Sequence, residues 1–126
     1  DNIRQIAGEV SGRVVLAARA DFGDHIARAA AADLFLDSFT YNAHTTAVDA
    51  LWGGVPVVTL PGPVINSRLA AGALGALGPG SETLVRTAAE YQELALRLAS
   101  HPRALARLRE WLGLGGRGGL ESRPLF

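Results

Sequence analysis

The 126-residue sequence contains neither cysteine nor methionine. Without cysteine the chain can form no disulfide, and thiolate nucleophiles and zinc–thiolate sites are excluded as well. The redox compartment stays open, because a chain without cysteine suits any compartment. Since the sequence begins at Asp1 and contains no Met, we expect this chain to be a part of a larger protein.

Lysine is also absent, so all twelve basic residues are arginines. Twelve Asp and Glu balance them, and the formal net charge is zero. This neutrality argues against nucleic acid or an anionic membrane as an electrostatically bound partner. No run of about 18 apolar residues occurs, and no charged start precedes an apolar stretch. The sequence therefore predicts neither a membrane span nor a secretory signal.

What the sequence does contain is a composition typical of one folded domain, with 48% hydrophobic and 19% charged residues. Short apolar runs predict strands at residues 13–18, 34–36, 55–60 and 83–85. Helical periodicity and helix-end signals predict helices at residues 24–32, 45–52, 67–77, 87–99 and 103–112. Five glycines between residues 113 and 119 predict a loop. The alternation of strands and helices predicts an α/β fold with a parallel, doubly wound sheet.

The densest group of polar residues lies at 41–49, between a predicted strand and a predicted helix. Parallel α/β sheets bind ligands beyond the C-terminal ends of their strands, where helix N-termini favour anions. There His44, Thr45 and Thr46 could donate to a phosphate, and Asp49 could accept from ribose hydroxyls. A structural alternative stays open, because Thr45 or Thr46 is an ordinary N-cap and Thr46 with Asp49 has capping-box spacing.

A second pair, His25 and Arg28, shares one face near another helix start and could meet a base or a phosphate. The alternative is an ordinary helix surface, with the imidazole beside a solvated guanidinium. Ser67 is interpreted first as a helix N-cap, and Trp52 and Trp111 as core residues. The sequence assembles no Ser-His-Asp set, metal cluster, GxGxxG or phosphate loop. We therefore predict no catalytic residue and no metal ligand in this chain.

Several segments, taken in order, resemble the nucleotide-binding lobe of O-GlcNAc transferases. They are ADLFLD at 32–37, YNAHTT at 41–46, DALW at 49–52, GVPVVTLPG at 54–62 and SRLAA at 67–71. The spacing of that family is also kept at Arg13, His25, Glu90, Tyr91 and residues 124–126. The resemblance covers nearly the whole chain, and the central block is its most specific part.

This resemblance implies that residues 1–126 form the C-terminal, Rossmann-like lobe of a GT-B glycosyltransferase. Members of the family transfer N-acetylglucosamine from UDP-GlcNAc to Ser or Thr hydroxyls of proteins, with inversion and without a metal or a cofactor. The donor contacts that it implies are Ala20, His25 and Arg28 near the uracil, His44, Thr45 and Thr46 at the diphosphate, and Asp49 at the ribose. The resemblance and the lack of a signal together predict a cytoplasmic location, extending to the nucleus in a eukaryote.

The sequence also departs from the family. Phe22 stands where a lysine is common, which puts one donor contact in question. The lobe that carries the acceptor site and the catalytic histidine is not in this chain, nor are the tetratricopeptide repeats that recruit protein acceptors. We therefore expect the chain to be inactive by itself.

Two other hypotheses about the function remain open. One is a lobe of a GDP-fucose-dependent protein O-fucosyltransferase, although Asn42 and His44 favour the UDP donor. The other is a degenerate, non-catalytic binding module, which Phe22 and the glycine-rich segment favour.

Overall fold

The structure is a computed structural model and describes residues 2–77 and 81–113. Its helices are α1 (Asn2–Ala7), α2 (Phe22–Ala30), α3 (Thr45–Trp52), α4 (Leu69–Ala76), α5 (Ala88–Ser100) and α6 (Pro102–Trp111). The 3₁₀ turns are η1 (Gly8–Arg13), η2 (Ile65–Ser67) and η3 (Ser81–Thr83). None of the helices in the described ranges is long and apolar enough to cross a membrane.

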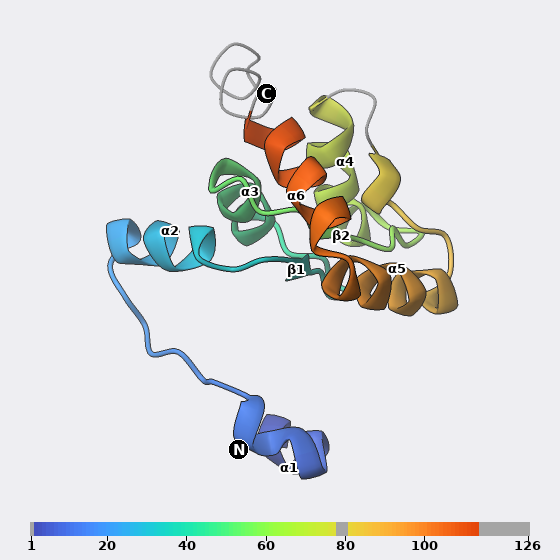
Figure 1. Cartoon of the computed structure of the whole chain (residues 1–126). Coiled ribbons are helices and arrows are strands. Elements are labelled where there is room, and N and C mark those ends of the chain that lie inside the picture. Colours follow the sequence, from blue (N-terminus) through green and yellow to red (C-terminus); the bar gives the residue numbers. More distant parts are fainter. Residues whose placement is uncertain (1, 78–80, 114–126) are drawn as a thin grey trace.

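The sheet consists of two parallel strands, β1 (Phe35–Leu36) and β2 (Val57–Val58). Phe35 pairs with Val57 and Leu36 with Val58, and β1 and β2 lie between α3 and α5 (Figure 1). Beyond β2, Thr59 forms a single parallel bridge with Leu84. The predicted α/β class and parallel pairing are confirmed, but the sheet is smaller than the prediction.

Alternation along β2 separates the core into two clusters. Val57 is fully buried against the helices on one face of the sheet, α3 and α4, and its cluster includes Leu51 and Leu74. Val58 points to the opposite face and packs with Leu98 of α5 in a second cluster that α6 completes. Successive side chains of a strand face opposite sides, so a two-residue strand is enough to serve both layers.

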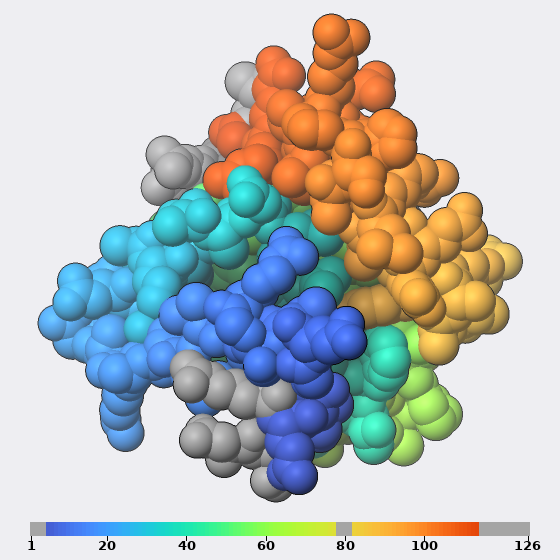
Figure 2. Space-filling view, turned by 60° about the horizontal axis from the view of Figure 1, so that its bottom comes forward, coloured from blue at the N-terminus to red at the C-terminus, as the bar shows by residue number. Residues whose placement is uncertain are grey.

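The predicted strand at residues 13–18 is wrong. Arg13 ends η1. Val14 is extended, but residues 14–21 belong to no helix or strand of the described part of the chain. Val15 is 86% exposed and Leu16 48%. Figures 1 and 2 show this segment on the outside of the molecule, leading from α1 to α2. Its β-branched residues favour extended backbone, but a strand also needs a hydrogen-bonding neighbour.

Most predicted helices are confirmed, and side-chain capping explains where two of them begin. α2 begins two residues early because the Asp21 side chain accepts a hydrogen bond from the backbone N–H of Asp24, at 3.0 Å. α5 begins after Thr87, whose hydroxyl accepts from the N–H of Glu90 at 3.1 Å.

Two further predictions concern the tryptophans and the glycine-rich loop. Trp52 is 46% exposed, so its assignment to the core is wrong. Trp111 is half-buried and packs against the first core cluster, as predicted. Of the predicted glycine-rich loop, residues 114–119 lie outside the described residues.

Candidate functional site

The candidate site lies where the chain leaves β1 and enters α3. Asp37 follows β1 directly and is only 3% exposed. Its Oδ1 accepts hydrogen bonds from the backbone N–H groups of Ser38, at 2.9 Å, and Ala43, at 2.6 Å. Its Oδ2 accepts from the Thr59 hydroxyl at 2.6 Å. These bonds fix both ends of the loop at 38–43, which leads into the start of α3.

α3 starts without a side-chain cap. Its N-cap residue is His44, whose side chain makes no capping hydrogen bond. Thr45 and Thr46 are the first two residues of the helix and are exposed, so the prediction that one of them is the N-cap is wrong. The first N–H groups of a helix have no partner within the helix and carry its positive dipole end. At this helix start they are left for an anionic ligand or water.

Two buried polar atoms beside this helix start lack a hydrogen-bond partner among the described residues. They are Nε2 of His44 and Oδ1 of Asn42. The amide nitrogen of Asn42 donates to the Ser38 carbonyl at 2.7 Å, which fixes the orientation of the amide group. The Tyr41 ring stacks on His44, with ring centroids 4.6 Å apart and planes at 19°. Burial of unsatisfied polar atoms is unfavourable, so both mark positions where a ligand or water gains a hydrogen bond.

Asp49, one turn into α3, is bound to His25 of α2. The two side chains are 24 residues apart in sequence, yet the imidazole Nε2 lies 3.1 Å from the carboxylate Oδ2. α2 and α3 can approach because Gly53 lies against Ala30, where a Cβ would come within 3.1 Å of the Ala30 Cα. The capping-box interpretation of Thr46 with Asp49 is therefore wrong, since the carboxylate bonds to the neighbouring helix.

The other predicted contacts near α2 are arranged differently. The Arg28 guanidinium donates to the Ala18 carbonyl at 2.8 Å. That bond ties the segment before α2 to the helix, with half-buried Ala20 between the two. His25 and Arg28 consequently have separate partners in this structure, and neither remains an unattached surface side chain.

A cavity of about 440 Å³ opens between α3 and α4. The residues that line it are the N-cap residue His44, then Thr45, Val48 and Asp49 of α3, and Leu69, Gly72, Ala73 and Ala76 of α4. Its size is within the range of small-molecule sites, which combine apolar walls with a few polar groups. Three of the predicted donor residues therefore share one cavity, whereas Thr46, His25, Arg28 and Ala20 do not line it.

Residues 2–113 match the family model described as glycosyl transferase family 41. The chain belongs to this family. It is 39% identical over 97 residues to the UDP-N-acetylglucosamine–peptide N-acetylglucosaminyltransferase of Caenorhabditis elegans, covering 77% of this chain and 8% of that protein. To a probable enzyme of the same kind from Arabidopsis thaliana it is 42% identical over 76 residues, 60% of this chain and 8% of that protein.

A solved structure of an O-GlcNAc transferase mutant from Thermobaculum terrenum is also similar to this chain. The match has a TM-score of 0.83 at 36% identity and covers 90% of this chain but 22% of that one. The resemblance to O-GlcNAc transferases is thereby confirmed, and the chain corresponds to a part of the catalytic region of family 41. It spans less than a tenth of the two curated relatives.

Within this family-41 chain, Ser67 has a different role from the one expected. Ser67 is not the N-cap of α4, which is Arg68. Ser67 is 2% exposed, and its hydroxyl donates to the Val64 carbonyl at 2.8 Å and accepts from the Val64 N–H at 3.3 Å. It therefore closes the turn at 64–67, and the Asn66 carbonyl next to it accepts from the N–H of Asn42 at 2.9 Å.

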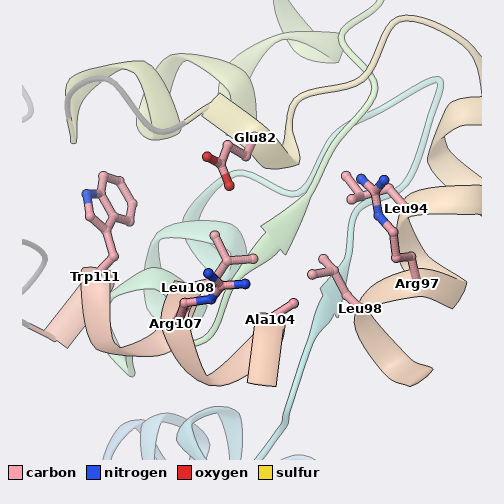
Figure 3. A pocket seen from close by; sticks show the side chains of 8 residues that line it. All are labelled: Glu82, Leu94, Arg97, Leu98, Ala104, Arg107, Leu108 and Trp111. Atoms are coloured by element: carbon pink, nitrogen blue, oxygen red, sulfur yellow. The ribbon is translucent and has the colours of Figure 1, made fainter. Parts of the chain in front are cut away.

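A second and larger cavity, of about 570 Å³, lies away from these residues, between η3, α5 and α6 (Figure 3). Leucines from α5 and α6 form part of its wall, and Arg97, Arg107 and Glu82 contribute charged groups. None of the predicted donor residues lines it. The described residues also contain no group of three or more side chains placed to hold a metal ion.

The buried contacts of Asp37 are the part of the site that the sequence patterns missed. The patterns predict a strand that ends just before Asp37 and another that contains Thr59, but they do not predict the bond between these two side chains. A polar Thr inside the apolar run 55–60 was the available signal, because a buried hydroxyl requires a hydrogen-bond partner.

Proposed function

We propose that this chain is the donor-binding part of a protein O-GlcNAc transferase and that its donor is UDP-GlcNAc. The observation that carries the proposal is the cavity at the uncapped start of α3, where His44, Thr45 and Asp49 meet. The two curated relatives are named as a UDP-N-acetylglucosamine–peptide N-acetylglucosaminyltransferase and a probable one, and these names support this choice of donor.

The diphosphate would bind at the start of α3. The free N–H groups of the first turn, the hydroxyls of Thr45 and Thr46, and the His44 imidazole would donate to its oxygens. When the bond between the sugar and the diphosphate breaks, negative charge grows on the leaving UDP. Donors that are already oriented stabilise that charge more than they stabilise the intact donor, which lowers the barrier to transfer.

The nucleoside would extend from the diphosphate toward α2. His25 holds Oδ2 of Asp49, which leaves Oδ1 to accept hydrogen bonds from the ribose hydroxyls. Arg28 fixes the segment before α2 through the Ala18 carbonyl, so the backbone of Ala20 and the His25 ring would border the uracil. In this arrangement Arg28 supports the uracil site through the backbone.

Transfer to a protein would need more than this chain. The chain covers 8% of the nematode relative, and the sequence predicts no catalytic residue within it. We therefore propose that it binds the donor but does not transfer the sugar, and that Ser and Thr acceptors are recognised by other parts of the protein.

The test is a titration of the isotopically labelled 126-residue chain with UDP, following the backbone amide signals of Thr45, Thr46 and Asp49. We expect saturable shifts of these signals. A hydrogen bond to a charged group contributes about 1.5–3 kcal/mol, so Asp49→Asn should weaken UDP binding about tenfold or more. Glu93→Gln, an exposed change on α5, is the matched control and should leave binding unchanged.

The same titration is repeated with GDP and with UDP-GlcNAc. Tighter binding of GDP than of UDP would favour the fucosyltransferase alternative. A folded chain that binds neither nucleotide would favour the non-catalytic module, and transfer of GlcNAc to a peptide by this chain would refute its inactivity.

A further inference from the structure

Asp37, directly after β1, is a buried carboxylate. Burying a carboxylate is unfavourable unless hydrogen bonds or opposite charges compensate for the lost water. Among the described residues no cation lies within salt-bridge distance of Asp37. Three donors compensate instead, namely two backbone N–H groups and the Thr59 hydroxyl.

The three hydrogen bonds are divided unequally between the two carboxylate oxygens. Oδ1 accepts from both Ser38 and Ala43, which closes the loop onto one atom. Oδ2 accepts a hydrogen bond from the hydroxyl of Thr59, which directly follows β2 and is buried, and this bond attaches the carboxylate to the core. An ionised carboxylate can accept all three bonds at once, whereas an amide has one accepting oxygen. The carboxylate therefore holds the loop through one oxygen and Thr59 through the other.

The loop that Asp37 closes ends at the donor site. Ala43 immediately precedes His44, the N-cap of α3, so the bond from the Ala43 N–H fixes the peptide that enters the helix. We propose that Asp37 is a positioning residue for the donor site, holding His44 and the first turn of α3 oriented toward the diphosphate. This role rests on the proposed function, and Asp37 itself touches no ligand in it.

If Asp37 has a merely structural role, a different result is expected. A variant at Thr59 distinguishes the structural role from the positioning role. Thr59→Val removes the bond to Oδ2 in the buried core but keeps both bonds to the loop. Asp37→Ala removes all three bonds. If Asp37 only stabilises the fold, both variants should affect UDP binding in proportion to their loss of stability.

The experiment measures three quantities for the 126-residue chain and both variants: the UDP dissociation constant, the hydrogen-exchange rate of the Ala43 amide, and the thermal midpoint. For Asp37→Ala we expect UDP binding about tenfold weaker or more, and Ala43 exchange faster by a similar factor. For Thr59→Val we expect a lower midpoint, with a dissociation constant within about twofold of wild type. Asp37→Asn, which keeps one acceptor, should restore part of the affinity.

Wild-type affinity in Asp37→Ala, or an equal loss in Thr59→Val, would overturn the positioning role. If Asp37→Ala does not fold, Asp37→Asn decides by the same two readouts. Faster Ala43 exchange with weaker UDP binding supports the role, and faster exchange at wild-type affinity overturns it. If the wild-type chain binds no UDP, the proposed function fails, and exchange at Ala43 still reports whether Asp37 holds the loop.

Discussion

Tyr91 should make the stability of this protein fall in strongly alkaline solution, above about pH 10. Its hydroxyl donates to the Asp37 carbonyl at 2.8 Å, and its ring meets Phe39 edge-on at 4.8 Å. Burial, together with the nearby Asp37 carboxylate, raises the pKa of Tyr91 from 10.0 to about 12. The neutral phenol is therefore favoured in the folded state more than in the unfolded state.

The sign and size of the effect follow from this difference. Below pH 10 both states hold the phenol proton, and the contribution of Tyr91 to stability is complete. Between about pH 10 and 12 the unfolded state has released its proton while the folded state keeps it, so the free energy of unfolding falls. A pKa rise from 10.0 to about 12 corresponds to a loss of up to about 3 kcal/mol across that window.

The composition makes this window unusually simple to measure. The chain has no Lys and no Cys, and Tyr41 is its other tyrosine. Urea unfolding from pH 8 to 12 in a Tyr41→Phe background would therefore report Tyr91, with phenolate absorbance as a second readout. Tyr91→Phe should be about 1–2 kcal/mol less stable at pH 8, because the Asp37 carbonyl loses its donor. The two stabilities should then converge toward pH 12.

Two outcomes would refute this reasoning. One is an alkaline decline in Tyr91→Phe as steep as in its parent. The other is ionisation of the folded-state Tyr91 phenol near pH 10.

Four substitutions at three positions test the local structure by urea unfolding. Gly75→Ala in α4 should stabilise the chain by about 0.5 kcal/mol, because nothing lies within 4 Å of the new Cβ and Ala favours helix. Gly62→Ala should destabilise it by about 1–3 kcal/mol, because its Cβ would lie 2.8 Å from the Ser67 Cβ. A loss of stability in Gly75→Ala, or a gain in Gly62→Ala, would refute the corresponding expectation. Thr87→Ala should cost about 1 kcal/mol through loss of the α5 cap, whereas Thr87→Ser should retain most of it.

Local sequence patterns predicted those parts of the fold whose signals are themselves local. The start of α3 at Thr45 was predicted to the residue, and the strands around residues 35 and 57 were found by their apolar runs. The observed start of a helix differs from the predicted one where a side chain accepts a hydrogen bond from a backbone N–H, as Asp21 does at the start of α2. Such capping depends on one side-chain rotamer, which helical periodicity does not report.

The site was predicted less completely, because its decisive contacts join distant residues. His25 and Asp49 were each proposed as donor contacts, but nothing in the sequence pattern pairs residues 24 positions apart. The bond from Tyr91 to Asp37 spans 54 positions. Residue type and position at a helix start identified the chemistry, whereas the way these side chains constrain one another required the tertiary structure.

The segment at 13–18 shows the same division between conformation and packing. Its β-branched start predicted a buried strand. The backbone of Val14 is extended, but Val15 is 86% exposed. Backbone preference is a property of the residues, but burial requires a neighbour that the local sequence cannot specify. Phe22, at the start of α2, is likewise 75% exposed. The curated relatives are far longer than this chain. In a protein of that length, we expect other segments to pack against the side chains of Val15 and Phe22.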